Sequence, residues 1–292
     1  MQTYIDNEVM TLLGQRLGEL EDHLHSDVIS FFGPLVEGVD GMFKRHIESL
    51  QEGKTTKRLD VILTTRGGSA ETVERIVNTL RHHYEEVNFI VPNYAYSAGT
   101  VLCMSGDAIY MNYYSVLGPI DPQVVNDDDK LVPALGYLDK VNEMITKCKK
   151  GELTDVEFVI LESLDLAELR SYEQARDLTV DLLKKWLVKY KFKNWNKHSK
   201  TGKAVTQKEK EQRAEHIAEK LGDTSIWHTH ARPISLIELQ NDLQLKIENY
   251  DDDPKLKCKI ENYFGVMQDY TEKYHRSISF HTRRSNSWTN QR

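Results

Sequence analysis

The chain has 292 residues, of which 39% are hydrophobic and 28% charged, and its formal net charge is −7 at pH 7. This is the composition of a globular protein with a core, and its acidic balance argues against general affinity for nucleic acid or an anionic membrane. No stretch approaches the roughly 18 apolar residues of a membrane span, and the acidic N-terminus lacks the features of a signal peptide. Three cysteines without a paired spacing favour a reducing compartment. We therefore expect a cytoplasmic protein that binds neither nucleic acid nor a membrane.

The first half of the chain alternates amphipathic patterns with short apolar runs. Apolar residues at helical spacing predict helices within 4–25, 38–50, 69–84 and 95–106. Runs rich in β-forming residues predict buried strands within 27–36, 59–65, 87–93 and 107–112. Strands that alternate with helices at this spacing indicate βαβ units, so we expect an α/β core with a mainly parallel sheet.

The pattern becomes helical after about residue 136. Helices are predicted within 136–150, 156–191, 206–222 and 234–250. Thr206 and Glu209 have the spacing of a capping box, and Gly222 is expected to end the helix that they begin.

These patterns divide the chain into four expected segments. They are an N-terminal amphipathic helix over 1–26, an α/β core over 27–135, a helical extension over 136–276 and a polar tail over 277–292. The tail is expected to be mobile because it is terminal and polar.

Two predicted strand-to-helix turns carry residues suited to acyl transfer. Gly67 and Gly68 follow a buried strand, where glycines allow a tight turn and leave backbone N–H groups accessible. Ser97 follows the next strand at the start of a helix, where N–H groups converge on a developing anion. Together they supply a nucleophile and two oxyanion donors, the N–H groups of Gly68 and Ala98. Glycine and serine are also common in ordinary turns of this kind, so spacing alone leaves both interpretations open.

The sequence around these turns resembles that of a known family. The segments TTRGGSAETVERIVNTLR and NYAYSAGTVLCMSGDAIYMNYYSVLGPIDPQV look like those of ClpP-like serine peptidases, which have the ClpP/crotonase fold. The similarity is greatest to the serine dehydrogenase proteinase family, which is related to signal peptide peptidase A (SppA) and to NfeD-type proteases. It covers about residues 27–125 well and the helical remainder more loosely.

The resemblance implies roles for individual residues. Ser97 is the expected nucleophile of a peptidase, and the N–H groups of Gly68 and Ala98 are the expected oxyanion hole. Gly67, Ser69 and Tyr96 are assigned to substrate binding, because in such proteins the strand beside the glycines binds extended peptide by β-addition. No cofactor and no metal are expected.

The general base is where the sequence departs from ClpP, which has a histidine about 25 residues after the serine. Here that region reads Leu-Gly-Pro-Ile-Asp-Pro-Gln over 117–123. SppA and NfeD-type relatives use a Ser-Lys dyad instead, and Lys140 lies at the corresponding spacing on a predicted helix with an apolar face. A lysine acts as a base only where burial or nearby cations lower its pKa. We therefore expect Lys140 to be the base, with Lys147 or Lys149 as less favoured choices.

His228 and His230 are the alternative bases, since two histidines spaced by two in an extended segment point to one side. Asp121 is a further candidate, as a charge partner or as a structural residue of its turn.

Two other functions stay open at this point. A catalytically inactive ClpP-fold scaffold that assembles and binds peptide is compatible with the missing histidine. A crotonase-like acyl-CoA enzyme uses the same oxyanion hole, although Ser97 argues against it. The resemblance also implies a homo-oligomer acting on peptide or protein substrates, with the helices over 4–25 and 136–192 as interfaces.

Overall fold

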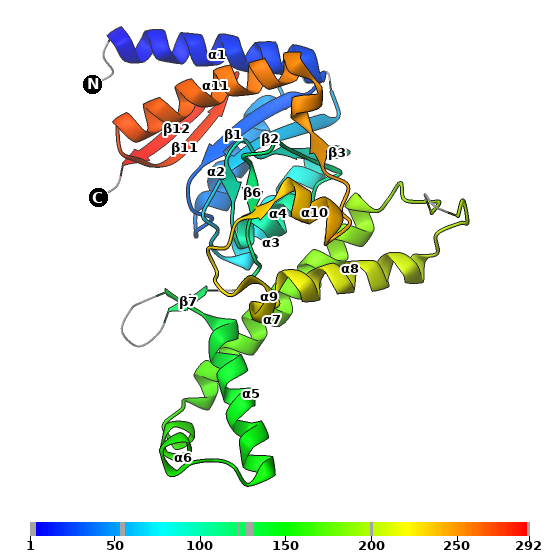
Figure 1. The fold of residues 1–292 in the computed structure, drawn as a ribbon. Helices are drawn as coiled ribbons and strands as arrows, with labels where there is room; N and C mark the ends of the chain where they lie inside the picture. Colours follow the sequence, from blue (N-terminus) through cyan, green and yellow to red (C-terminus); the bar gives the residue numbers. More distant parts are fainter. Residues whose placement is uncertain (1–3, 53–55, 122, 126–130, 199–200, 291–292) are drawn as a thin grey trace.

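The computed structural model describes residues 4–52, 56–121, 123–125, 131–198 and 201–290. At its centre, a mixed sheet of seven strands has the order β10-β5-β3-β2-β1-β11-β12 (Figure 1). From β10 to β1 all neighbours are parallel, whereas β11 and β12 pair antiparallel. The expected α/β core with a mainly parallel sheet is confirmed.

The strands of this sheet are β1 Asp27–Phe32, β2 Arg58–Thr64, β3 Glu86–Ile90, β5 Ala108–Met111, β10 Glu248–Asn249, β11 Arg276–Thr282 and β12 Asn286–Asn290. Three short strands form a second sheet: β4 Tyr94–Ala95, β6 Val116–Leu117 and β9 Ile234–Ser235. A hairpin pairs β7 Gln123–Val125 with β8 Leu131–Pro133.

The longer helices are α1 Tyr4–Leu24, α2 Val39–Leu50, α3 Ala70–His83, α5 Ala134–Lys150, α7 Leu166–Trp186, α8 Gln207–Leu221 and α11 Pro254–Lys273. The shorter helices are α4 Ala98–Met104, α6 Asp155–Glu162, α9 Thr224–Trp227 and α10 Leu236–Asn241. Most lie where the sequence predicts them, and α8 begins with the expected Thr206–Glu209 capping box. No helix in the described part of the chain is both long and apolar enough to cross a bilayer.

Two hydrophobic cores lie on opposite faces of the sheet, because successive side chains of a strand point to opposite faces. In β1, Ile29 and Phe31 join the core beneath α2, α3 and α4. Val28 and Phe32 join a second core with α1 and α11, which lie side by side (Figure 1). The fully buried strand that the sequence predicts here is the consequence of this two-sided burial.

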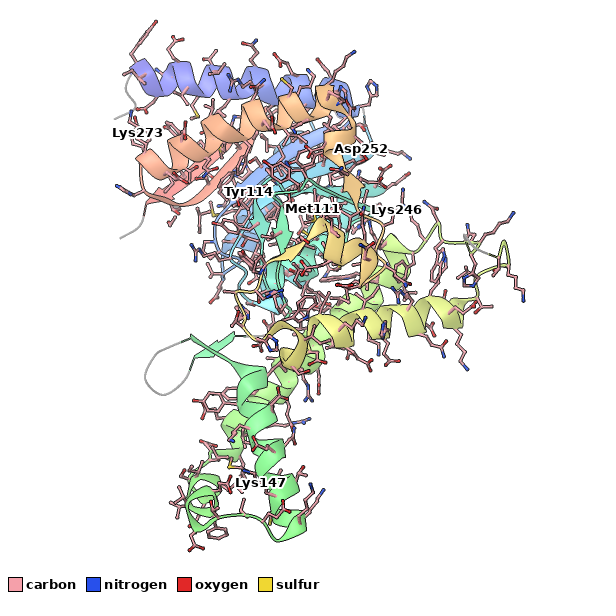
Figure 2. All side chains as sticks on the ribbon, in the orientation of Figure 1. Met111, Tyr114, Lys147, Lys246, Asp252 and Lys273 are labelled. Atoms are coloured by element: carbon pink, nitrogen blue, oxygen red, sulfur yellow. The ribbon has the colours of Figure 1, made fainter. Side chains whose placement is uncertain are left out.

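A helical arm projects from this body (Figure 1). It consists of α5, α6 and the first part of α7, with a small core of Leu135, Leu138 and Tyr172. In Figure 2, Lys147 lies on this arm, where its ammonium group is 2.6 Å from the carboxylate of Glu157 and so ties α5 to α6.

The C-terminal segment differs from the expected polar tail, because residues 277–290 lie almost wholly in β11 and β12 and complete the sheet. Phe280 is fully buried, with its ring centroid 4.8 Å from those of Phe31 and Phe43. The polar residues here bond to the body: the two ring nitrogens of His46 each lie 2.7 Å from a serine hydroxyl, of Ser285 and Ser287. The polar composition of this segment therefore did not exclude a hairpin, because several of its polar side chains bond within the fold.

The helix expected over 234–250 is also largely wrong. Its first residues form β9, α10 ends at Asn241, and Gln244 has a φ of 45° that no helix permits. The buried residues Leu243, Leu245 and Ile247 then continue as an apolar connection to β10. Their alternation fits an extended chain, and in so short an apolar run it is also compatible with helical spacing.

The docked hairpin predicts acid sensitivity. Burial lowers the pKa of His46 and of His281 from 6.5 to about 4 in the folded chain. Below pH 6.5 the unfolded chain therefore takes up protons that the folded chain does not, and stability falls until about pH 4. For one such histidine the loss is roughly 2–3 kcal/mol. Urea unfolding between pH 7.5 and 4.5 measures it.

His46→Gln removes one of these titrations and is expected to flatten the pH dependence. His216→Gln, which replaces an exposed histidine on α8, is the matched control. An unchanged slope in His46→Gln would contradict the assignment.

Candidate active site

Ser97 lies at a strained turn between β4 and α4. Its φ of 52° and ψ of −118° belong to a region that non-glycine residues rarely occupy. Such strain costs on the order of 1–3 kcal/mol and persists only where the surroundings impose it. Ser97 is the N-cap of α4, yet its side chain makes no capping hydrogen bond. Its hydroxyl is therefore not consumed by the helix that it begins.

Thr65 aligns the glycine turn with the serine turn. The Thr65 N–H donates to the Tyr94 carbonyl (3.1 Å), and the Tyr96 N–H donates to the Thr65 carbonyl (3.0 Å). A Cβ on Gly67 would lie 2.8 Å from the Tyr96 carbonyl oxygen and 2.9 Å from the Ser97 Cβ. Gly67, whose φ is +102°, is thus required both for its conformation and for the close approach.

Gly68 is held from its other side by Leu35. The Leu35 N–H donates to the Gly67 carbonyl (2.8 Å), and the Ser69 N–H donates to the Leu35 carbonyl (2.9 Å). A Cβ on Gly68 would overlap the Leu35 backbone. These bonds use the groups on either side of Gly68 and leave its own N–H without an acceptor among the described residues. The Ala98 N–H likewise has no acceptor there, so the turns supply two unused donors beside Ser97.

Thr100 fixes the turn that carries Asp121. Its hydroxyl donates to the Gly118 carbonyl (2.8 Å) and accepts from the Gly118 N–H (3.0 Å). The Ser97 hydroxyl faces the Asp121 carbonyl oxygen at 3.5 Å, and the Asp121 carboxylate accepts from the Leu135 N–H at the start of α5 (3.1 Å).

His230 is brought to Asp121 from more than a hundred residues away. The antiparallel pairing of β6 with β9 places the segment before β9 against the turn of residues 117–121. The His230 Nδ1 lies 4.0 Å from the Asp121 Oδ2, and this nitrogen is buried without a hydrogen-bond partner in the described residues. Both Ser97 and His230 thus face Asp121, one at its carbonyl and one at its carboxylate.

Burial shifts the pKa values of Asp121 and His230. It raises the pKa of Asp121 from 3.8 to about 6 and lowers the pKa of His230 below 6.5. At neutral pH the imidazole is therefore neutral, which is the form that accepts a proton.

A cavity of about 350 Å³ borders the pair. Its lining is Pro119, Asp121, Gly136, Gly222, Asp223, Trp227, His228, Thr229 and His230. Both candidate histidines line it, but their segment is not the expected extended one, since α9 ends at Trp227 and His228 has a φ of 63°. His228 is exposed, whereas only 16% of the His230 side chain is exposed.

The structure does not bring Lys140 to Ser97 among the contacts of the described residues. Its side chain is 59% exposed on α5, and its ammonium group is 2.8 Å from the Glu143 carboxylate. Lys147 is likewise paired with carboxylates, those of Glu143 and Glu157.

The residues assigned to substrate binding are placed differently from one another. Ser69 is the N-cap of α3 and accepts from the Thr72 N–H, so its side chain has a structural use. The ring of Tyr96 stacks on Tyr94 with centroids 5.4 Å apart. A Cβ on Gly118 would meet this ring at 2.5 Å, so Gly118 leaves the space that Tyr96 occupies.

Sequence reasoning missed Thr65, Leu35, Asp223 and Trp227. The threonine pair before Arg66 was the available signal for Thr65, because a hydroxyl next to a glycine turn often bonds the backbone. Here the Thr65 hydroxyl accepts from the Gly67 N–H (3.0 Å). No group of three or more His, Cys, Asp or Glu side chains in the ranges described is arranged to hold a metal ion.

The fold and the site together define a class of protein. A serine at a strained strand-to-helix turn, beside unused backbone donors on an α/β sheet, is an arrangement of serine hydrolases. The family of ClpP-like SDH-type serine proteinases matches residues 43–208, more than half of the chain. The chain belongs to this family, which supports a serine peptidase.

The individual relatives have low sequence identity to this chain or match only a small part of it. Two uncharacterized proteins of Methanocaldococcus jannaschii are 31% identical over 126 residues (43% of this chain and 38% of the relative) and 36% identical over 78 residues (27% of each). The chain thus spans well under half the length of these curated relatives.

Two solved structures are variants of the 1510-N membrane-bound stomatin-specific protease. The first has a TM-score of 0.45 and 13% identity, and the match covers 80% of this chain and 81% of that one. The second, in complex with a substrate peptide, has a TM-score of 0.32 and 21% identity, with 39% and 54% covered.

The close approach of the two turns predicts that a side chain on Gly67 reduces the reactivity of Ser97. Gly67→Ala is expected to push the Ser97 turn away and to lower the rate of fluorophosphonate labelling of Ser97 at least about 100-fold, as loss of an oxyanion donor does. Gly151→Ala is the control, because Gly151 also has a positive φ (+71°) but open space around it. Equal labelling rates in both variants would contradict the packing argument.

Proposed function

We propose that this chain cleaves peptide bonds through an acyl-enzyme on Ser97. The observation that carries the proposal is the Ser97 turn itself: a buried serine in a strained conformation, uncommitted to capping, beside two unused N–H donors. Its family membership adds the substrate class.

The oxyanion hole of the proposal is formed by the N–H groups of Gly68 and Ala98. As Ser97 Oγ attacks the substrate carbonyl, negative charge develops on the carbonyl oxygen. Two fixed donors stabilise that charge more than they stabilise the neutral ground state, which lowers the barrier.

The base of the proposal is His230, positioned by Asp121. The neutral imidazole accepts the Ser97 hydroxyl proton during attack and returns it to the leaving amine; in the second half it activates water against the acyl-enzyme. The Asp121 carboxylate orients the ring and stabilises the imidazolium. The separation of 4.0 Å is longer than a hydrogen bond, and such contacts tighten when substrate binds.

Lys140 is the base that the family resemblance favours. Its exposure and its ion pair with Glu143 oppose that role in this conformation, because the ammonium group is engaged by a carboxylate on the surface of α5. Variants of His230 and Lys140 distinguish the two candidate bases.

Intact mass after fluorophosphonate treatment at pH 7.5 tests nucleophile and base together. Wild type is expected to gain one adduct, and Ser97→Ala none. His230→Gln is expected to slow labelling by about 100-fold or more, the usual contribution of a general base. Asp121→Asn, which keeps an acceptor for the Leu135 N–H, is expected to slow it less. Lys140→Ala is the matched control and should label at the wild-type rate.

Loss of labelling in Lys140→Ala with retention in His230→Gln would assign the base to Lys140 instead. The pH profile gives a second readout. A base with the lowered pKa of His230 gives a rate that levels off by about pH 7.5, whereas an ordinary lysine base gives a rate still rising towards pH 10. A folded wild type without any adduct would favour the inactive scaffold.

The proposal includes assembly into a homo-oligomer, and free cysteines, two of them exposed, support a reducing compartment such as the cytoplasm. The arm supports assembly because α6 has no buried residue. Its apolar side chains Val156, Phe158 and Val159 are 71%, 57% and 62% exposed. Apolar side chains gathered at the end of a projecting arm are typical of a contact surface.

Sedimentation at micromolar concentration tests this. Wild type is expected to be larger than a monomer of 33.8 kDa, and Val159→Asp is expected to shift it towards the monomer. Glu152→Gln, at an exposed polar position of the same arm, is the control. A wild-type monomer at these concentrations would refute assembly through the arm.

A further inference from the structure

The cavity beside His230 extends beyond what the proposed catalytic steps use. Asp121 and His230 form one part of its wall, and the segment of residues 222–229 forms another. Its volume of about 350 Å³ lies within the range of pockets that hold small ligands, roughly 300–1,000 Å³. It therefore has room for a substrate side chain next to the base.

The chemistry of a general base indicates which substrate residue lies there. The proton taken from Ser97 must be returned to the nitrogen of the leaving amine. His230 must therefore reach that nitrogen, which belongs to the residue that follows the scissile bond. A cavity lined by the base lies beside the side chain of that residue.

The lining has an acidic character. Of the nine residues that the structure assigns to it, two are aspartates and none is lysine or arginine. The buried Asp121 carboxylate faces a histidine at 4.0 Å instead of a cation. Burial lowers the pKa of that histidine, and no lysine or arginine stands among the described lining residues to balance the carboxylates.

Asp223 and Trp227 provide a second wall. The Asp223 Oδ1 accepts from the Ser225 N–H (2.8 Å) and from the Ser225 hydroxyl (2.6 Å), which fixes the carboxylate at the start of α9. The Trp227 Nε1 donates to the Lys220 carbonyl (2.6 Å), which fixes the indole. A fixed carboxylate and a fixed indole are both favourable to a cation, the first by charge and the second by its ring face.

We propose that this cavity binds the cationic side chain of a lysine or arginine that follows the scissile bond, with Asp223 as its charge partner. The inference rests on the proposed function, because it takes His230 as the base and Ser97 as the nucleophile. It adds a substrate preference on the leaving-group side.

The subsite is tested separately from acylation by measuring how the acyl-enzyme divides between attack by an amine and attack by water. Wild type is acylated with an activated peptide ester, whose alcohol leaves, and amino-acid amides then compete with water for the acyl group. Attack by the amine transfers the acyl group from Ser97 Oγ to nitrogen, and the proton that this nitrogen loses passes through the base to Ser97 Oγ. Mass spectrometry gives the ratio of aminolysis to hydrolysis for arginine amide, lysine amide, norleucine amide and glutamic acid amide.

Arginine amide and lysine amide are expected to exceed norleucine amide about tenfold, a difference of about 1.4 kcal/mol, and glutamic acid amide by more. Asp223→Asn keeps the acceptor that caps α9 and is expected to lose this preference. Asp223→Glu keeps the charge and is expected to retain much of the preference. Asp155→Asn, an exposed aspartate at the start of α6, is the matched control.

Equal partition among the four amides in wild type would overturn the subsite. A preference that survives in Asp223→Asn would overturn the role of Asp223. A wild type that labels and acylates normally but shows no preference leaves the proposed function intact, whereas a wild type that forms no acyl-enzyme removes the proposed function and the subsite together.

Discussion

Two backbone hydrogen bonds of Thr65, one to Tyr94 and one from Tyr96, hold the centre of this molecule in place. They hold the glycine turn against the serine turn, in which Ser97 has its strained conformation. The sheet makes the contact possible, because β2 and β3 are parallel neighbours and the turns that follow them leave at the same edge. The candidate site therefore lies where the turns after β2 and β3 meet at one edge of the sheet.

Helices from the second half of the chain pack beside this edge of the sheet. The pairing of β6 with β9 and the hydrogen bond from the Ile120 N–H to the Leu221 carbonyl (3.1 Å) attach α8 and α9 beside Asp121. Through these contacts the core gains the partly buried His230 and the cavity beside it. In the proposed mechanism, the extension therefore supplies the base and the subsite beside Ser97.

The fold and the turn that carries Ser97 were predictable from the sequence because both depend on local patterns. The strands, the glycine pair and Ser97 lie within one stretch whose spacing is fixed by successive βαβ units. The proximity of His230 to Asp121 was not predictable, since it depends on the pairing of two-residue strands more than a hundred positions apart. Lys140 has the right distance along the chain, but spacing does not reveal that its side chain is exposed and ion-paired. The hairpin of β11 and β12 was hidden because its polar groups bond to His46 and to one another.

The arm has a mechanical consequence for the site. Its first helix starts with the Leu135 N–H bonded to the carboxylate of Asp121, and Leu135 and Leu138 fix this end against α7. A helix is stiff along its axis, so α5 moves as one piece. It is attached at its start to Asp121, the residue that faces both Ser97 and His230. A tilt of α5 imposed at its far end would therefore move the Leu135 N–H relative to the Asp121 carboxylate that accepts from it.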